Sequence, residues 1–90
     1  ATRERLSRVY QLFTDAERMA MRATTLAEMR MALDVLDECR AGLHYTVGPD
    51  EESGISPRDR EYMMDLTHRI EALRDDIRVK SDKLTRDKRK

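Results

Sequence analysis

The chain has 90 residues, of which 40% are charged, 39% hydrophobic and 4% aromatic, and its formal net charge is zero. A chain of this length forms one domain at most, with a core close to the smallest that is stable alone. Its periodic apolar residues and zero net charge argue against disorder, and no stretch approaches the roughly 20 apolar residues of a membrane span. The first ten residues hold three Arg and no apolar run, which argues against a signal peptide.

The charges are distributed unevenly along the chain. Residues 25–61 carry four Arg against nine acids, whereas residues 80–90 carry six cations against two acids. An acidic middle and a basic end can attract a second copy of the chain or a charged partner. The single cysteine, Cys39, excludes an internal disulfide framework and is better explained as a small buried residue of a reducing compartment than as a reactive thiol. We therefore expect a cytoplasmic protein.

Residues 3–23 predict the first helix. Its apolar seam recurs at steps of three and four residues and consists of Leu6, Val9, Phe13, Ala16, Ala20 and Ala23. Because the later seam residues are alanines, this helix can approach a partner more closely at its C-terminal end. The seam slips at Thr24 and Thr25, and the stretch from Thr25 to Glu28 matches a capping box. This pattern predicts either a stammer in one long helix or a break between two, and we favour a break at residues 24–25.

Residues 26–42 predict the second helix, in which Arg40 interrupts the apolar seam. Gly42 followed by an apolar residue is typical of a Schellman motif at a helix end. Residues 44–55 then form a connection. Within it, the β-prone stretch 45–47 could pair with Gly54 and Ile55 as a small β-hairpin.

The third helix begins at the strongest start signal in the chain. Ser56 can cap the helix, Pro57 suits the first helical position and Asp59 the third. We expect this helix to span residues 57–84 within a single domain of residues 1–84. Residues 85–90 contain no apolar residue, and we expect them to form a frayed basic tail.

We predict an all-α fold in which helices 26–42 and 57–84 form an antiparallel, coiled-coil-like hairpin joined by helix 3–23. The residues of the hairpin seam are Leu26, Met29, Leu33, Leu36, Met63, Leu66, Ile70, Leu73 and Ile77. The long helix, about 42 Å at 1.5 Å per residue, extends several turns beyond its partner. Its end therefore needs helix 3–23 or another subunit to cover it.

This uncovered end and the methionines are candidates for a partner contact. Lys80 occupies a seam position, where a charged residue sets the register or partner choice of a coiled coil. Methionines off the seams form either an adaptable binding surface or a widened core. The candidate contact residues are Ile77, Lys80, Leu84, Met19, Met21, Met31 and Met64.

The basic tail raises the alternative of a nucleic-acid-binding module. The candidate phosphate contacts are Lys83, Arg86, Lys88, Arg89 and Lys90. No aromatic residue is interleaved with them for base stacking. Cations at the end of a helix also complement the helix dipole in the absence of any ligand, so nucleic-acid binding is the second interpretation.

No stretch is typical of a catalytic or metal site. Neighbouring carboxylates such as Asp75 and Asp76 diverge by about 100° on a helix, so they do not form a catalytic pair. His44 and His68 lack the spacing of a zinc site, and no phosphate-binding or nucleophile motif is present. We expect no enzymatic activity, no cofactor and no small-molecule ligand.

Residues 26–77 resemble the small head–tail joining proteins of tailed bacteriophages. The resemblance is carried by Leu26–Glu28, Ala32–Leu36, Arg40–Gly42, Tyr45–Val47, Ile55–Asp59 and the spacing of Leu66, Ile70, Leu73 and Ile77. In that family two helices flank a short β-hairpin, and copies assemble as a ring at the neck of the capsid. The chain departs from the family in its acidic Asp50–Glu52 connection and in its additional N-terminal helix.

The expected function is protein–protein assembly. The patterning predicts a small structural subunit or adaptor that works as a homo-oligomer or in a larger assembly, with a protein as its partner. The resemblance implies a more specific form, a virion component at the phage neck.

Overall fold

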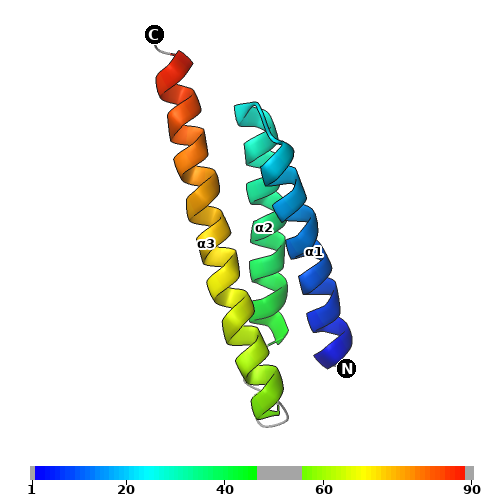
Figure 1. The fold of residues 1–90 in the computed structure, drawn as a ribbon. Coiled ribbons are helices and arrows are strands. Elements are labelled where there is room, and N and C mark those ends of the chain that lie inside the picture. Colours follow the sequence, from blue (N-terminus) through cyan, green and yellow to red (C-terminus); the bar gives the residue numbers. More distant parts are fainter. Residues whose placement is uncertain (1, 47–55, 89–90) are drawn as a thin grey trace.

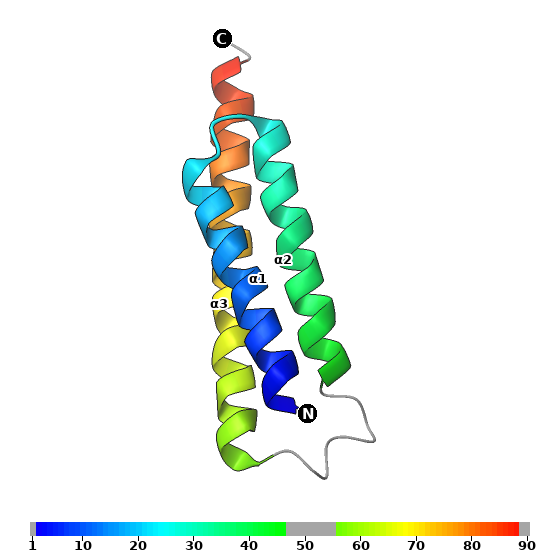
Figure 2. The same cartoon turned by 90° about the vertical axis from the view of Figure 1, so that its right-hand side faces the viewer.

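The computed structural model describes residues 2–46 and 56–88 of the chain. These residues form three α-helices, α1 (Thr2–Arg22), α2 (Leu26–Thr46) and α3 (Pro57–Lys88). The helices lie side by side in an elongated bundle, with α2 antiparallel to both α1 and α3 (Figures 1 and 2). No strand occurs in the described ranges, and the predicted all-α fold with a helical hairpin and an N-terminal helix is confirmed.

The break between α1 and α2 lies at the two consecutive threonines, as expected. The Thr25 hydroxyl accepts a hydrogen bond from the Glu28 backbone N–H at 3.1 Å. The Glu28 carboxylate in turn accepts hydrogen bonds from the Thr24 backbone N–H at 3.3 Å and from the hydroxyls of Thr24 and Thr25 at 3.2 and 3.0 Å. This reciprocal capping satisfies backbone donors that the first turn of a helix leaves without a partner, so it favours a new helix at Leu26.

The start of α3 is also capped as the sequence predicts. The Ser56 hydroxyl accepts a hydrogen bond from the Asp59 backbone N–H at 3.1 Å. Pro57 is the first residue of the helix. α3 continues to Lys88, four residues beyond the expected end at Leu84. The part of the predicted basic tail that the structure describes is therefore a further turn of helix.

The predicted end of α2 at Gly42 is wrong. α2 continues to Thr46, and Gly42 does not have a positive φ. A Cβ atom on Gly42 would lie 3.1 Å from Val9 Cγ2 of α1, so glycine at this position permits a close approach of two helices. Tyr45 and Thr46, which were expected in a β-hairpin, are helical, and residues 47–55 lie outside the described residues.

The core is one continuous cluster that receives side chains from all the described helices. The buried apolar residues are Leu6, Val9, Phe13, Ala16, Ala20, Ala23, Met29, Ala32, Leu36, Cys39, Leu43, Met63, Leu66, Ile70 and Ile77. The predicted seam of the first helix is therefore confirmed in full. α1 and α2 make the most extensive contact in the bundle, and α1 and α3 the least.

The buried stripe of α2 is rotated from the predicted one. Ala32 and Cys39 are fully buried, whereas Leu33 is half-buried and Arg40 is exposed. Small side chains face the core because α2 lies close against α1. The predicted hairpin of α2 with α3 exists, but the tightest pair in the bundle is α1 with α2.

Candidate functional site

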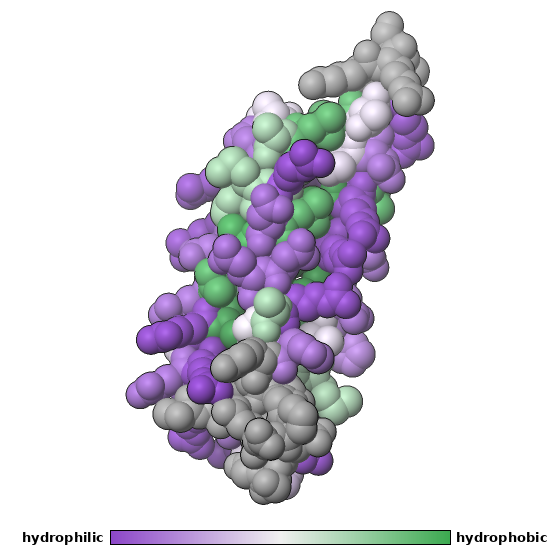
Figure 3. All heavy atoms as spheres, turned by 180° about the vertical axis from the view of Figure 1, so that it is seen from behind, coloured by the Kyte–Doolittle hydropathy of each residue, from purple (hydrophilic) through white to green (hydrophobic). Residues whose placement is uncertain are grey.

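A groove lies between α2 and α3. It has a volume of about 620 Å³ and is lined by Asp37, Arg40, Ala41, Leu43, His44, Thr67, Ile70 and Glu71. Leu43 and Ile70 form its floor, because both belong to the buried core. Seen from behind in Figure 3, hydrophobic side chains reach the surface in a broken line that is bordered by hydrophilic ones. An apolar floor with a polar rim is the form of groove into which an amphipathic helix docks.

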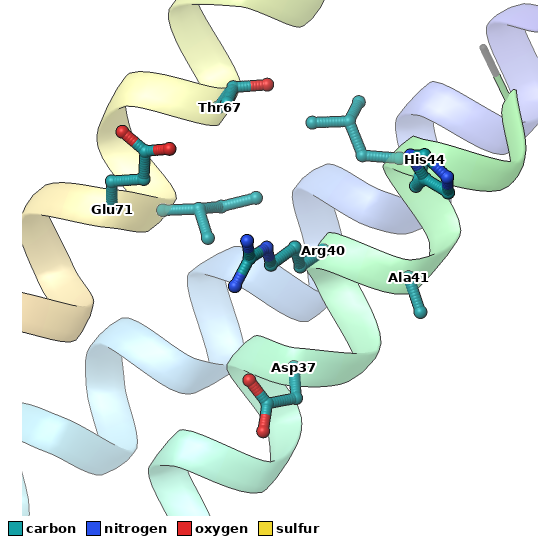
Figure 4. A pocket seen from close by; sticks show the side chains of 8 residues that line it. Asp37, Arg40, Ala41, His44, Thr67 and Glu71 are labelled. Carbon is teal, nitrogen blue, oxygen red and sulfur yellow. The ribbon is translucent and has the colours of Figure 1, made fainter.

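The rim of this α2–α3 groove carries charges of both signs. Arg40 extends from α2 into the space between the helices, with Thr67 and Glu71 across it on α3 (Figure 4). Asp37 lies one turn before Arg40 on α2. The sequence suggested that Arg40 interrupts the apolar seam of α2. In the structure, Arg40 lies outside the core. It is an exposed rim residue, and Cys39 occupies the adjacent core position.

A second groove, the C-terminal groove, lies where the turn between α1 and α2 meets the end of α3. It has a volume of about 430 Å³ and is lined by Met21, Ala23, Thr24, Met29, Lys80, Lys83, Leu84 and Asp87. Ala23 and Met29 are buried, and Leu84 is half-buried against the core. The groove therefore has an apolar floor, with two lysines and one aspartate at its edge.

The end of α3 is partly covered by the chain itself. The Lys80 ammonium donates a hydrogen bond to the Ala20 carbonyl oxygen of α1 at 3.0 Å, and the Ser81 hydroxyl donates one to the Met29 sulfur at 3.3 Å. Ile77 is 2% exposed. Its prediction as a partner contact is therefore wrong, since α1 and α2 already cover it. Leu84 and Lys80 reach the C-terminal groove and stay candidates for a contact.

The sequence allowed the methionines outside the seams to form either a widened core or an exposed apolar surface, and the structure contains both kinds. Met19 is half-buried against the core. Met21 is 79% exposed, Met31 57% and Met64 60%. The exposed group therefore supplies apolar surface outside the core, on each of the described helices.

A pair of tyrosines on α1 and α3 was not singled out from the sequence. Tyr10 and Tyr62 together line a hollow of about 280 Å³, and each is about half exposed. Arg69, which lines the same hollow, pairs with Asp65 at 3.1 Å. Partial burial raises the pKa of the Tyr62 phenol, and the nearby Tyr10 adds to the effect. The signal in the sequence was the heptad spacing of Tyr62 and Arg69, which places them on one edge of α3.

Cys39 is a core residue, as predicted. Its thiol donates a hydrogen bond to the Val9 carbonyl oxygen at 3.6 Å. Burial, with smaller contributions from the charges of Glu38 and Asp15, raises the pKa of the thiol from 9.0 to about 11. The thiol therefore stays protonated at neutral pH and is unsuited to nucleophilic chemistry in the folded protein.

The candidate phosphate contacts are only partly described. Lys83 and Arg86 are exposed on the last turns of α3. The side chain of Lys88, and Arg89 and Lys90 entirely, lie outside the described residues. Within the described ranges, no group of His, Cys, Asp and Glu side chains is placed to hold a metal ion. No described helix is long and apolar enough to cross a membrane.

The fold is a small helical bundle with grooves between its helices. No protein-family model, curated protein or solved structure matches the chain significantly. Its function is therefore inferred from its own surface.

Proposed function

We propose that this chain is a protein-assembly subunit that binds a second copy of itself through the α2–α3 groove. The observation that supports this most directly is the form of the groove. Its floor of Leu43 and Ile70 is apolar, and its rim carries Asp37, Arg40 and Glu71. Such a surface offers hydrophobic burial at its centre and charged groups that set orientation at its edge.

The mixed charges of the rim favour a second copy as the occupant. When two identical surfaces meet about a two-fold axis, each residue contacts the symmetry-related set. In that arrangement Arg40 of one copy can face Asp37 or Glu71 of the other, and the same pairing recurs on the opposite side of the axis. A rim of a single sign would instead repel its own copy.

A more specific role, a virion component at the neck of a phage, is implied by the sequence resemblance alone. The first two residues of the β-hairpin that this resemblance implies, Tyr45 and Thr46, are helical here. The proposal of self-assembly does not depend on that role. It applies equally to a cytoplasmic adaptor, the other setting we propose for this chain.

Light scattering coupled to size exclusion tests the proposed assembly. We expect a mass that rises with concentration from 10.6 kDa towards twice that value. Ala41→Arg should shift the equilibrium towards monomer, because Ala41 is an exposed residue that lines the groove. Ala72→Arg is the matched control, since Ala72 is an exposed alanine of α3 that does not line the groove.

The outcomes are distinct. A wild-type protein that stays monomeric at every concentration contradicts self-assembly. A dimer that Ala41→Arg leaves intact contradicts the groove as its interface. A dimer weakened equally by Ala72→Arg indicates a general effect of added charge. Nucleic acid that binds the monomer with a strong dependence on salt would favour the second interpretation instead.

A further inference from the structure

The C-terminal groove lies where α3 continues past the end of α1. The Lys80 ammonium reaches the Ala20 carbonyl oxygen at 3.0 Å, and α1 ends two residues after Ala20, at Arg22. α3 runs for eight residues beyond Lys80 to Lys88, about 12 Å at 1.5 Å per residue. Figure 1 shows this end of α3 projecting beyond α1 and α2. The side of α3 that continues the line of α1 is therefore open to a further segment.

The base of this open side is apolar. Ala23 and Met29 are buried beneath it, and Leu84 is half-buried against the core. Met21, which lines the same groove, is 79% exposed. A methionine side chain is flexible and polarizable, so it adapts to apolar groups of different shapes. The groove volume of about 430 Å³ leaves room for a few apolar side chains of a partner.

The charge around the groove is mainly positive. Residues 80–90 carry six cations against two acids. Lys83 lines the groove and is exposed, and Arg86 is exposed three residues further along α3. Asp87 is the acid among the lining residues, and Lys80 and Lys83 are the cations. This excess of positive charge attracts an acidic partner and repels a basic one.

We infer that the C-terminal groove binds an acidic amphipathic helix of a partner protein. Such a helix presents an apolar stripe and a charged face together, and it lays the stripe into an apolar groove. The stripe packs on Met21, Met29 and Leu84, and carboxylates beside the stripe pair with Lys83 and Arg86. The bound helix then lies along the last turns of α3 and continues the line of α1.

The occupant is a different protein, because the apolar stripes of α1, α2 and α3 are already buried in the core of their own chain. The contact is also independent of the self-assembly proposed above. Lys83 and Met21 line the C-terminal groove and are not among the residues that line the α2–α3 groove. One copy of the chain can therefore use both grooves.

Model peptides test the inference. The probe is a fluorescently labelled amphipathic helix of about 14 residues, roughly four turns, with a leucine stripe and glutamates on its other faces. A second peptide has lysine in place of every glutamate, and a third has the residues of the first in an order without a stripe. We expect only the first peptide to bind, as measured by fluorescence anisotropy. Its affinity should fall with added salt, because salt screens exposed charges.

Two matched pairs of variants locate the binding site. Lys83→Glu should raise the dissociation constant of the acidic peptide about tenfold, because repulsion replaces attraction. Arg78→Glu makes the same change of charge at an exposed residue of α3 that does not line the groove, and it should have no such effect. Met21→Ser should raise the dissociation constant about threefold, because it removes apolar contact area. Met64→Ser is its control, since Met64 is 60% exposed and does not line the groove.

Each outcome decides the inference. Loss of affinity in Lys83→Glu and Met21→Ser, with both controls unaffected, supports it. Absence of binding, or equal binding of the acidic peptides with and without a stripe, overturns it. An oligonucleotide that binds more tightly than the peptide, with no response to Met21→Ser, assigns this end of the chain to nucleic acid and also overturns it. Ala41→Arg should bind the peptide as the wild type does, so failure here leaves the proposed assembly standing. A peptide that only Ala41→Arg releases occupies the α2–α3 groove, which overturns the assignment to the C-terminal groove.

Discussion

The Lys80 ammonium of α3 donates a hydrogen bond to the Ala20 carbonyl oxygen of α1 at 3.0 Å. Ala20 belongs to the last turn of α1, where backbone carbonyls have no partner within the helix. Lys80 therefore caps α1 from a neighbouring helix and joins the two helices that contact each other least. From the sequence, Lys80 was a charge placed in an apolar seam. In the fold, Lys80 lies beside the buried stripe of α3, on the side of the helix that faces α1.

Replacing Lys80 should destabilise the monomer. We expect Lys80→Met to lower the free energy of unfolding by about 1 kcal/mol, because the hydrogen bond is charge-assisted but partly exposed to water. Lys83→Met is the matched control, and it should leave the unfolding free energy within about 0.5 kcal/mol of wild type. Urea denaturation of the monomer at low concentration measures both. Equal losses in the two variants would contradict the capping role of Lys80.

The effect of Gly42→Ala on stability should depend on whether Val9 is present. Alanine gains about 1 kcal/mol over glycine within a helix, but its Cβ would lie 3.1 Å from Val9 Cγ2. Val9 is buried, and a β-branched side chain on a helix has one favoured rotamer, so it cannot turn away. We therefore expect Gly42→Ala to give no gain in the wild type and a gain of about 1 kcal/mol in a Val9→Ala background. A double-mutant cycle by chemical denaturation tests this, and equal effects in both backgrounds would contradict it.

An introduced charge should destabilise the fold more at Ile70 than at Leu73, although both belong to the predicted hairpin seam. Ile70 is 2% exposed, whereas Leu73 is half-buried. We expect Ile70→Asp to cost about 4 kcal/mol or more, which is enough to unfold a domain of ordinary stability. Leu73→Asp should cost about 1–2 kcal/mol, because water can reach the carboxylate. Circular dichroism with thermal denaturation separates them, with Ala72→Asp as the exposed control.

Local signals in the sequence predicted the helices and their starts. The caps at Ser56 and Thr25 depend on residues within one turn, so they could be identified without knowledge of the fold. The seam of α1 was equally clear, because its spacing allowed one apolar stripe. These features are enough to predict the all-α architecture.

Features that depend on how helices approach each other could not be predicted in the same way. The predicted stripe of α2 runs through Leu33 and Arg40, whereas the buried stripe runs through Ala32 and Cys39. The close packing against α1 selects these small residues. Gly42 was read as a helix end by a local rule, whereas its contact with Val9 decides its role. Both grooves arise from this packing, so the sequence indicated some of their residues but not their shape.

Cys39 should be unreactive in the folded protein. Burial raises the pKa of its thiol to about 11, so only about one thiol in a thousand is ionised at pH 8. The side chain is also fully buried, which blocks access of a reagent. We expect labelling by a thiol reagent to be slow in buffer and to accelerate with urea in parallel with unfolding. Complete labelling of the native protein within minutes would contradict this burial.

Glu28 should make the stability of the bundle depend on pH in the acidic range. Hydrogen bonds from the Thr24 backbone N–H and from the hydroxyls of Thr25 and Thr24 lower the pKa of its carboxyl below the ordinary value of 4.5. A group whose pKa is lower in the folded state stabilises that state above its unfolded pKa, and this contribution is lost as the pH falls through the folded pKa. We therefore expect the melting temperature of the wild type to fall more steeply below pH 4.5 than that of Glu28→Gln. Thr25→Ser keeps the hydroxyl and should keep the steep fall, whereas Thr25→Ala should reduce it. Parallel curves for all four proteins would mean that the capping carboxylate contributes nothing to the acid response.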